Sequence, residues 1–389
     1  MSRQAAAALG AATALNLPFG TIYAFSVFLR PMEALLAIGR TQMSLVFGLA
    51  TITLTLGMNL APWLYRRTAS WSVVMLCGLV SALGLWLAAS ATGFIQLLIG
   101  YGLMFGLGAG VGFIVVQQGV NQTVVRRRGL ANGYVIAMYP LGAMIGAPVF
   151  GWAIGLWGLR PTLAGLGVTV LLACSFAAWL LRNAGVRARA GAFNSDGSAG
   201  GNRGVFLRLF GIFFLAAAAG LTVMSQAAGI IQAYGGATTL ALGATSFITA
   251  AIAAARIGGG WLVDRFPVPA VACFAHLWSL TGALILTAIP GPLVAVPALA
   301  MIGMGYGLIS GMTAAAIGLY WHPDDFGRIA GRLYISWCVA AVSLPILAGW
   351  IFDQTQGYGM AVMIAAAGNV AGAWLARGLP VPGARSSTG

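Results

Sequence analysis

The sequence is poor in charge. Only 7% of its 389 residues are charged, six of them are acidic, and no lysine occurs at all. Soluble globular domains carry about 25% charged residues, so this composition excludes a water-soluble enzyme. It also excludes a nucleic-acid-binding protein, despite a net charge of +14. With 60% hydrophobic residues and a mean hydropathy of +0.93, the chain is typical of a helical protein in a lipid bilayer.

Cysteine is scarce as well. The four cysteines, Cys77, Cys174, Cys273 and Cys338, fall in four different apolar segments and show no metal-ligand spacing. We interpret them as reduced packing residues, since cysteine is among the most often buried residue types. No nucleophile–base pair and no metal cluster is evident, so we expect no enzymatic activity, no cofactor and no metal. A cleavable signal peptide is not expected, because the first apolar run is too long for one.

Long apolar runs, by contrast, fill most of the chain. About 20 apolar residues suffice to span a bilayer as a helix, and each run reaches or approaches that length. The runs cover residues 5–29, 42–65, 71–90, 94–121, 129–157, 161–182, 206–233, 240–263, 269–289, 293–320, 329–352 and 358–376. The sequence therefore predicts an all-α membrane protein with twelve transmembrane helices.

One polar stretch divides these runs into two groups of six. It is rich in glycine and serine, which is typical of a flexible linker. We therefore predict an N-terminal six-helix bundle over residues 1–182, a cytoplasmic linker over 183–205, a C-terminal six-helix bundle over 206–377 and a cytoplasmic tail over 378–389.

The arginines indicate the orientation in the membrane. Three of them fall in loops on one predicted face, Arg30, Arg40 and Arg160. Sixteen fall on the other: Arg3, Arg66, Arg67, Arg126, Arg127, Arg128, Arg182, Arg187, Arg189, Arg203, Arg208, Arg265, Arg328, Arg332, Arg377 and Arg385. Because cytoplasmic loops carry the excess of basic residues, both termini are predicted to be cytoplasmic, in a bacterial inner (plasma) membrane.

The two halves of the chain repeat each other at an offset of about 200 residues. Trp63–Arg67 closes the second run as Trp261–Arg265 closes the eighth, and Gly106–Gly110 in the fourth run matches Gly307–Gly311 in the tenth. Two parallel six-helix halves around a linker are typical of secondary transporters, whose binding site lies near the membrane midplane.

Arg256 is the one ionisable residue well inside an apolar run and far from either end. It lies two to three helical turns, roughly 10–14 Å, before the Asp264–Arg265 pair that ends the run. An intramembrane arginine costs about 3 kcal/mol on insertion scales, so it marks a functional site by default. Its planar guanidinium can give a carboxylate two parallel hydrogen bonds. The alternative is a structural arginine that pairs with helix carbonyls or polar side chains.

The segments, the half-repeat and the Trp261–Arg265 loop together resemble the major facilitator superfamily over essentially the whole chain. Residues 20–31 resemble the first helix of its oxalate:formate antiporter and monocarboxylate transporter branches, residues 255–264 the eighth and 331–353 the eleventh. The resemblance implies two pseudo-symmetric six-helix bundles that work by alternating access as a monomer. It also implies that Arg256 anchors a substrate carboxylate.

Departures from those branches narrow the expected substrate. The oxalate-type carriers have a lysine in helix eleven for a second carboxylate, and none occurs around Trp337 and Ala341. The proton-coupled branch has a lysine and an aspartate near the positions of Val27 and Ile252. We therefore expect a small organic monoanion, with no proton relay of carboxylates. His276, which titrates near neutral pH, is a candidate relay.

Other polar and aromatic residues of the apolar runs are candidates for binding the substrate, because buried amides in lipid seek partners. The candidates are Tyr23, Tyr139, Trp337, Gln117, Asn121, Gln226 and Tyr306. The resemblance singles out Tyr23, Tyr139 and Trp337 as aromatics that close over the substrate. Asp264 and Arg265 are expected to form a conformational latch with Arg328 and Arg332. The counterpart of this latch in the N-terminal half has Arg66 where an aspartate is usual.

Three other functions stay open at this point. An aromatic, amide-rich cavity with one arginine suits a neutral vitamin such as riboflavin. A copper importer is a further alternative, although the paired methionine and histidine ligands of such carriers are missing. The chain could also be a sensor that binds substrate without transporting it. In each case the partners are a small molecule and the lipid bilayer, and no nucleic acid.

Overall fold

The computed structural model describes residues 1–189, 203–355 and 357–381, whose regular structure is helical. Within this part of the chain, twelve helices are long and apolar enough to cross a membrane. The protein is therefore a multi-pass membrane protein, and the prediction of an all-α fold with twelve spans is confirmed.

The chain forms two compact units. Unit 1 comprises Met1–Arg126, Met138–Ala192 and Pro323–Tyr334, and unit 2 comprises Arg127–Ala137, Phe193–His322 and Ile335–Gly389. Two long helices, α7 (Arg128–Trp157) and α13 (Phe326–Thr355), therefore begin in one unit and continue in the other. The domain boundaries predicted from the sequence divide the chain at one linker. They therefore do not include the division of α7 and α13 between the two units. Most of the predicted linker, residues 190–202, and most of the predicted tail, residues 382–389, lie outside the described residues.

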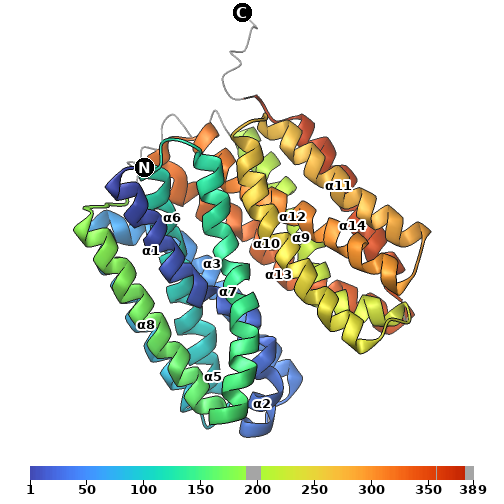
Figure 1. Cartoon of the computed structure of the whole chain (residues 1–389), viewed down its shortest axis with the longest axis horizontal. Coiled ribbons are helices and arrows are strands. Elements are labelled where there is room, and N and C mark those ends of the chain that lie inside the picture. The colour runs from blue at the N-terminus through green and yellow to red at the C-terminus, as the bar shows by residue number, and fades with distance from the viewer. Residues whose placement is uncertain (190–202, 356, 382–389) are drawn as a thin grey trace, which may run out of the picture. The chain divides into compact units, whose positions relative to one another are not determined.

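Unit 1 consists of the helices of the N-terminal half and the first turns of α13. They are α1 (Arg3–Gly20), η1 (Thr21–Ala24), α2 (Ser26–Leu36), α3 (Arg40–Arg67), α4 (Ser70–Ala89), α5 (Phe94–Leu97), η2 (Leu98–Phe105), α6 (Gly106–Thr123), the later part of α7, α8 (Leu159–Asn183) and η3 (Pro323–Asp325). In this unit α1 packs between α6 and α8, as Figure 1 shows, and α4 packs along α8.

Two predicted runs are interrupted in this unit. The first run is broken at Gly20 by a 3-10 turn, where the Thr21 hydroxyl donates to the Pro18 carbonyl oxygen (2.6 Å). The fourth run contains a π-helical segment, Leu98–Phe105, between α5 and α6. A 3-10 stretch within a helix often marks a hinge, and π turns inside an α-helix are frequent at functional sites. Both irregular segments are therefore candidates for a functional role.

Unit 2 holds the remaining helices. They are α9 (Arg203–Ala233), α10 (Thr238–Val263), α11 (Val268–Ala288), α12 (Pro292–Tyr320), α14 (Gly359–Arg377), the first turns of α7 and the rest of α13. α11 and α14 lie side by side, and α12 packs against α9, α10 and α11 (Figure 1).

Glycines set how closely α10 and α12 approach. Gly303, Gly307 and Gly311 recur every four residues on α12, and a Cβ atom at Gly311 would overlap the backbone of Arg256. Small residues at this spacing let two helix backbones touch. In lipid such close packing holds helices together, because the hydrophobic effect does not drive one helix against another there. This contact fixes the part of α10 that carries the arginine.

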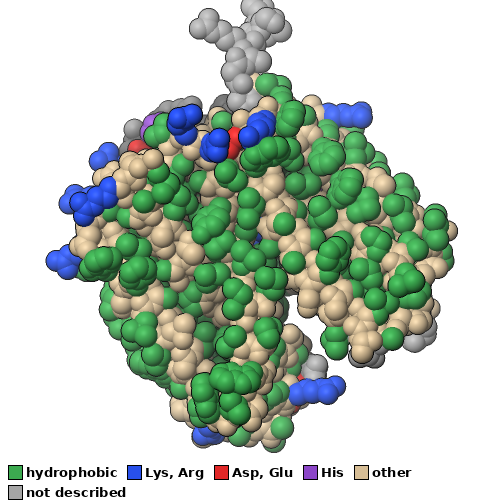
Figure 2. Space-filling model, in the orientation of Figure 1, with side chains coloured by type: hydrophobic (Ala, Val, Ile, Leu, Met, Phe, Trp, Pro, Cys, Tyr) green, Lys and Arg blue, Asp and Glu red, His purple; other side chains and the backbone are tan. Residues whose placement is uncertain are grey.

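The outer surface is apolar. Figure 2 shows hydrophobic side chains spread over the whole face, with most of the blue side chains near its edges. On α8, for example, Leu172, Phe176 and Trp179 are all exposed. Exposed apolar side chains along the whole length of a helix are those expected to face lipid hydrocarbon.

Candidate functional site

Arg256 of α10 is buried in unit 2, with 3% of its surface exposed. One guanidinium nitrogen, Nη1, donates to the backbone carbonyl of Ile136 on α7 (3.1 Å), and Nη2 donates to the Tyr306 hydroxyl on α12 (3.0 Å). The guanidinium carbon also lies 5.3 Å from the centre of the Tyr306 ring, within cation–π range. Both of these acceptors are uncharged, and the two bonds orient the guanidinium.

The carbonyl that receives Arg256 is released by a proline. In an α-helix the carbonyl of residue 136 accepts from the amide of residue 140, but Pro140 has no amide hydrogen. The Ile136 oxygen therefore lacks its usual α-helical donor, and Arg256 supplies one from a neighbouring helix. The sequence analysis missed this partner, although Pro140 inside an apolar run is the signal that could have revealed it.

Tyr306 links the arginine to a third helix. Its hydroxyl also accepts a hydrogen bond from the indole Nε1 of Trp337 on α13 (2.9 Å). Arg256, Tyr306 and Trp337 are all buried, and we call them the arginine triad. Three of the residues expected to bind the substrate are thus brought together by the packing of α10, α12 and α13.

One face of α10, which carries Arg256, Gly260 and Asp264 four residues apart, packs on the start of α7. A Cβ atom at Gly260 would overlap the Gly129 carbonyl, so the two backbones are in contact. At the end of α10 the Asp264 carboxylate accepts from the backbone amides of Gly129 (2.8 Å) and Leu130 (2.9 Å). A carboxylate at a helix N-terminus satisfies unpaired amides and the positive end of the helix dipole. Asp264 therefore caps α7 from outside.

In unit 1, Tyr23 and Tyr139 also meet. A Cβ atom at Gly20 would overlap the backbone of Tyr139, and this close crossing of α1 and α7 brings the two tyrosine rings to 6.1 Å in an edge-to-face contact. Phe113 of α6 lies between the rings of Tyr139 (5.2 Å) and Tyr334 (5.5 Å). The hydroxyl of Tyr139 donates to the Ala109 carbonyl (3.2 Å), so this tyrosine is held by the scaffold.

The amides of α6 differ from one another. Gln117 is fully buried, and neither atom of its amide has a hydrogen-bond partner among the described residues. Asn121, one turn on, donates to the Gln117 backbone carbonyl (3.0 Å). A buried amide without partners costs roughly 1–3 kcal/mol, so Gln117 is retained for a reason other than stability.

Two further candidates are held by α14 in unit 2. The amide oxygen of Gln226 accepts from the Tyr358 hydroxyl (3.1 Å). His276 is buried, its Nδ1 lies 2.9 Å from the Asn369 amide oxygen, and Gly372 packs against its ring. These are the contacts of packing residues, and the relay role of His276 stays a prediction.

The four residues expected to form a latch fall in both units. Asp264 caps α7, as described, and Arg265 lies over the Trp261 ring (3.9 Å). In unit 1, Arg328 pairs with Asp325 (2.8 Å), and Arg332 is exposed on α13. Their joint action as a latch stays a prediction.

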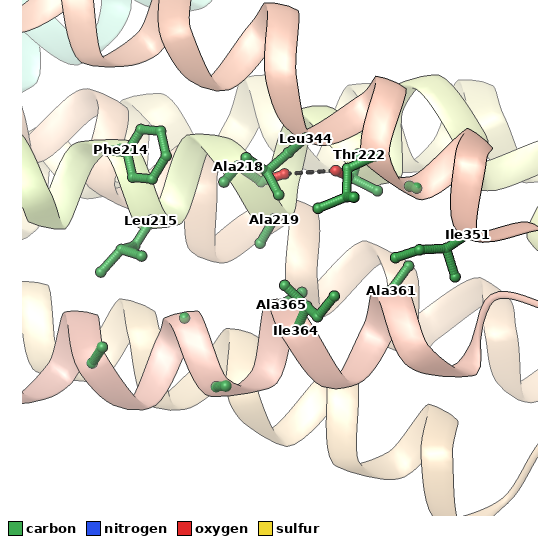
Figure 3. A pocket seen from close by; sticks show the side chains of 15 residues that line it. Phe214, Leu215, Ala218, Ala219, Thr222, Leu344, Ile351, Ala361, Ile364 and Ala365 are labelled. Carbon is green, nitrogen blue, oxygen red and sulfur yellow. Dashed lines mark hydrogen bonds between the residues drawn. The ribbon is translucent and has the colours of Figure 1, made fainter.

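An apolar cavity of about 360 Å³ opens in unit 2 between α9, α13 and α14. Figure 3 shows that alanine, leucine and isoleucine side chains line it, with Thr222 as a polar member. The Thr222 hydroxyl is already bonded to the Ala218 carbonyl (2.8 Å). An anion placed here would find no partner, so this cavity suits hydrocarbon and not a carboxylate.

Comparison with known proteins finds similarity to transporters. The profile described as Major Facilitator Superfamily matches residues 9–195. The uncharacterized MFS-type transporter YhjX of Escherichia coli (strain K12) is 23% identical over 330 residues, which are 83% of this chain and 82% of that protein. Monocarboxylate transporter 11 of Mus musculus is 27% identical over 348 residues, 82% of this chain and 74% of that protein. Monocarboxylate transporter 13 of Rattus norvegicus is 24% identical over 377 residues, 94% and 86%.

Solved structures show the same fold. The proton:xylose symporter XylE bound to 6-bromo-6-deoxy-D-glucose superposes with a TM-score of 0.70 at 14% identity, covering 97% of this chain and 96% of that one. FucP in the outward conformation gives a TM-score of 0.68 at 15% identity, covering 96% and 98%. At these identities the likeness concerns the fold alone.

Proposed function

We propose that this chain, a major facilitator transporter, carries a small organic monoanion and binds its carboxylate at Arg256. Its fold and family are those of transporters, which are not enzymes. The observation that carries the proposal is the arginine triad, in which a buried cation is oriented by two neutral acceptors.

The chemistry of the triad favours one negative charge. A guanidinium is always charged and gives a carboxylate planar, paired hydrogen bonds, which are stronger in a low-dielectric interior than in water. No acidic residue lies in the middle of an apolar run, and no lysine lies near Trp337 in the sequence. A guanidinium at this place therefore favours a ligand with one negative charge over a dianion.

The relatives support the same substrate class. Two of the proteins that match most of this chain are named monocarboxylate transporters. In this proposal Arg256 holds the carboxylate, while Tyr306 and Trp337 present a hydroxyl and an aromatic face beside it. The protein works by alternating access.

The test is uptake into proteoliposomes. Labelled monocarboxylates, dicarboxylates and riboflavin are offered to the wild type and to Arg256→Gln. We expect saturable uptake of at least one monocarboxylate, and a loss of about 100-fold in kcat/KM in the variant, since a charged, buried hydrogen-bonded pair is worth roughly 3 kcal/mol.

The matched control is Arg377→Gln. Arg377 is an exposed arginine at the end of α14, and its removal tests loss of charge without loss of the buried cation. Equal uptake of the best monocarboxylate by Arg256→Gln and wild type would refute the anchor. Uptake of riboflavin that is insensitive to Arg256→Gln would favour the neutral permease instead.

We also propose a bacterial inner-membrane location with both termini in the cytoplasm, based on the excess of arginine on one face. The described residues contain twelve candidate spans, and an even number supports termini on the same side. Fusions of green fluorescent protein and of alkaline phosphatase to the C-terminus test the side. The first is expected to fluoresce and the second to be inactive; the reverse pattern would invert the orientation.

A further inference from the structure

The two helices that are exchanged between the units, α7 and α13, are held by matching contacts. In unit 2, Gly133 of α7 packs against the backbone of Arg256, and in unit 1 Gly331 of α13 packs against the backbone of Met58. Gly133 and Gly331 are 198 residues apart, as are Met58 and Arg256. The repeat seen in the sequence is therefore also a repeat of helix contacts.

At the ends of these helices the repeat breaks down. The residue 198 positions before Asp264, which caps α7, is Arg66. An arginine side chain has only donors and cannot accept a hydrogen bond from a backbone amide. The start of α13 therefore needs a cap from elsewhere.

Gln118 of α6 supplies that cap. Its amide oxygen accepts from the backbone amide of Gly327 (2.9 Å), which is the counterpart of Gly129 in the repeat. Its amide nitrogen donates to the carbonyls of Pro323 (2.9 Å) and Arg189 (2.8 Å). In the repeat that matches Gly106–Gly110 with Gly307–Gly311, the residue that corresponds to Gln118 is Leu319, which has no polar side chain. The starts of α7 and α13 are thus capped by side chains on two different helices, α10 and α6.

Gln122, one turn later on α6, completes the arrangement. Its amide oxygen accepts from the backbone amide of Arg189 (3.0 Å), and its amide nitrogen donates to the carbonyl of the same residue (3.0 Å) and to the Asp324 carboxylate (2.7 Å). The side-chain amides of Gln118 and Gln122, one turn apart on α6, therefore hold two segments. One is the chain at Arg189, after α8, and the other is the start of α13. We call Gln118 and Gln122 the glutamine clamp.

We propose that the glutamine clamp is the latch of unit 1, which holds the first turns of α13 in one transport state and releases them in the other. It does for α13 what the Asp264 carboxylate does for α7. Trp337 of the arginine triad lies ten residues after Gly327 on the same helix, about 15 Å along its axis. Release of the clamp thus frees the helix that carries one wall of the triad.

The clamp is neutral, unlike the Asp264 cap. Apart from the bond between Gln122 and the Asp324 carboxylate, its hydrogen bonds involve no acid, so this latch opens by exchange of amide partners for water. Alternating access requires that such contacts be weak enough to break in each cycle, and hydrogen bonds between neutral groups satisfy this because their net contribution to stability is small.

Hydrogen–deuterium exchange of the full-length protein in detergent or nanodiscs tests the proposal without a substrate, and so independently of the monoanion proposal. The variants are Gln118→Leu, which removes all three bonds, and Gln118→Glu, which keeps the acceptor for Gly327 but loses both donors. Gln354→Leu, an exposed glutamine at the other end of α13, is the control. We expect exchange in residues 323–334 and 184–189 to rise about tenfold in Gln118→Leu and less in Gln118→Glu, with other peptides of unit 1 unchanged.

The transport rate separates a latch from a merely structural cap. With the best substrate of the uptake panel, we expect Gln118→Leu to change kcat by about fivefold or more while folding and reconstitution match the wild type. Unchanged exchange in residues 323–334 would overturn the clamp. Faster exchange with a kcat within twofold of the wild type would overturn its role as a latch. If Gln118→Leu does not fold, Gln118→Glu and Gln122→Ala answer the same questions.

Discussion

At the scale of single residues, Arg256 satisfies both interpretations that its position in the sequence allows. It bonds to a helix carbonyl and a phenol, as a structural arginine would, and its guanidinium carries the positive charge that an anion-binding arginine needs. The bonds to neutral acceptors restrict the rotamers of the guanidinium, and such preorganisation lowers the entropy that a ligand must otherwise supply.

Tyr306→Phe tests this preorganisation. The variant keeps the ring but removes the hydroxyl that joins Arg256 and Trp337, so the guanidinium loses one fixed partner. We expect the KM of the best monoanion to rise roughly tenfold with little change in expression, since a hydrogen bond to a charged group is worth roughly 1.5–3 kcal/mol. Uptake kinetics measure this. Tyr320→Phe, which removes a hydroxyl bonded to the Pro380 carbonyl at the end of the same helix, is the control.

Gln117 and Gln118 are neighbours in the sequence, but the Gln118 amide makes three hydrogen bonds and the Gln117 amide makes none among the described residues. Substitution of each by methionine, which has nearly the same volume, tests this difference. Gln118 loses three hydrogen bonds in Gln118→Met, so the protein is expected to be less stable. Gln117→Met removes a buried amide without described partners, so stability is expected to rise by roughly 1 kcal/mol. If Gln117 contacts substrate, the same variant transports more slowly. Thermal unfolding of the purified variants decides the first point, and a fall in melting temperature for Gln117→Met would contradict it.

At the scale of elements, the three glycines of α10 have three different environments. A Cβ atom at Gly259 would overlap the Leu308 carbonyl on α12, and one at Gly260 the Gly129 carbonyl on α7. At Gly258 the nearest atom is the end of the Leu308 side chain, 3.7 Å away. Gly259 and Gly260 are therefore needed for contacts with neighbouring helices, whereas position 258 has room for a larger side chain.

Alanine substitutions test this assignment. Gly258→Ala is expected to be neutral or to stabilise the protein by roughly 0.5–1 kcal/mol, because alanine favours the helix. Gly259→Ala and Gly260→Ala force α10 away from a neighbouring backbone, and we expect loss of folded protein on gel filtration or a strong loss of transport. Folded, fully active Gly260→Ala would mean that α7 and α10 do not depend on this contact.

At the scale of the whole molecule, the sequence was sufficient for the twelve spans, because each is a long apolar run and lipid permits only structures that satisfy their own backbone. The sequence also included Arg256, Tyr306 and Trp337 among the candidate substrate-binding residues. It could not predict that Ile136 receives the arginine or that Gln118 caps α13. These contacts join segments some 120 and 209 residues apart. Short-range periodicity carries no information about such pairs.

The internal repeat makes a final prediction, because it names the position from which a carboxylate would cap α13. Arg66 occupies the place of Asp264, and the neighbouring Tyr65 lies at Gly327 in the structure. Arg66→Asp introduced into Gln118→Leu should therefore return an acceptor to the start of α13. We expect exchange in residues 323–334 to fall back to within about twofold of the wild type. Arg67→Asp adds the same charge about 100° further around the helix and should not rescue. Rescue by both variants would point to net charge, and rescue by neither would mean that the repeat does not extend to the helix ends.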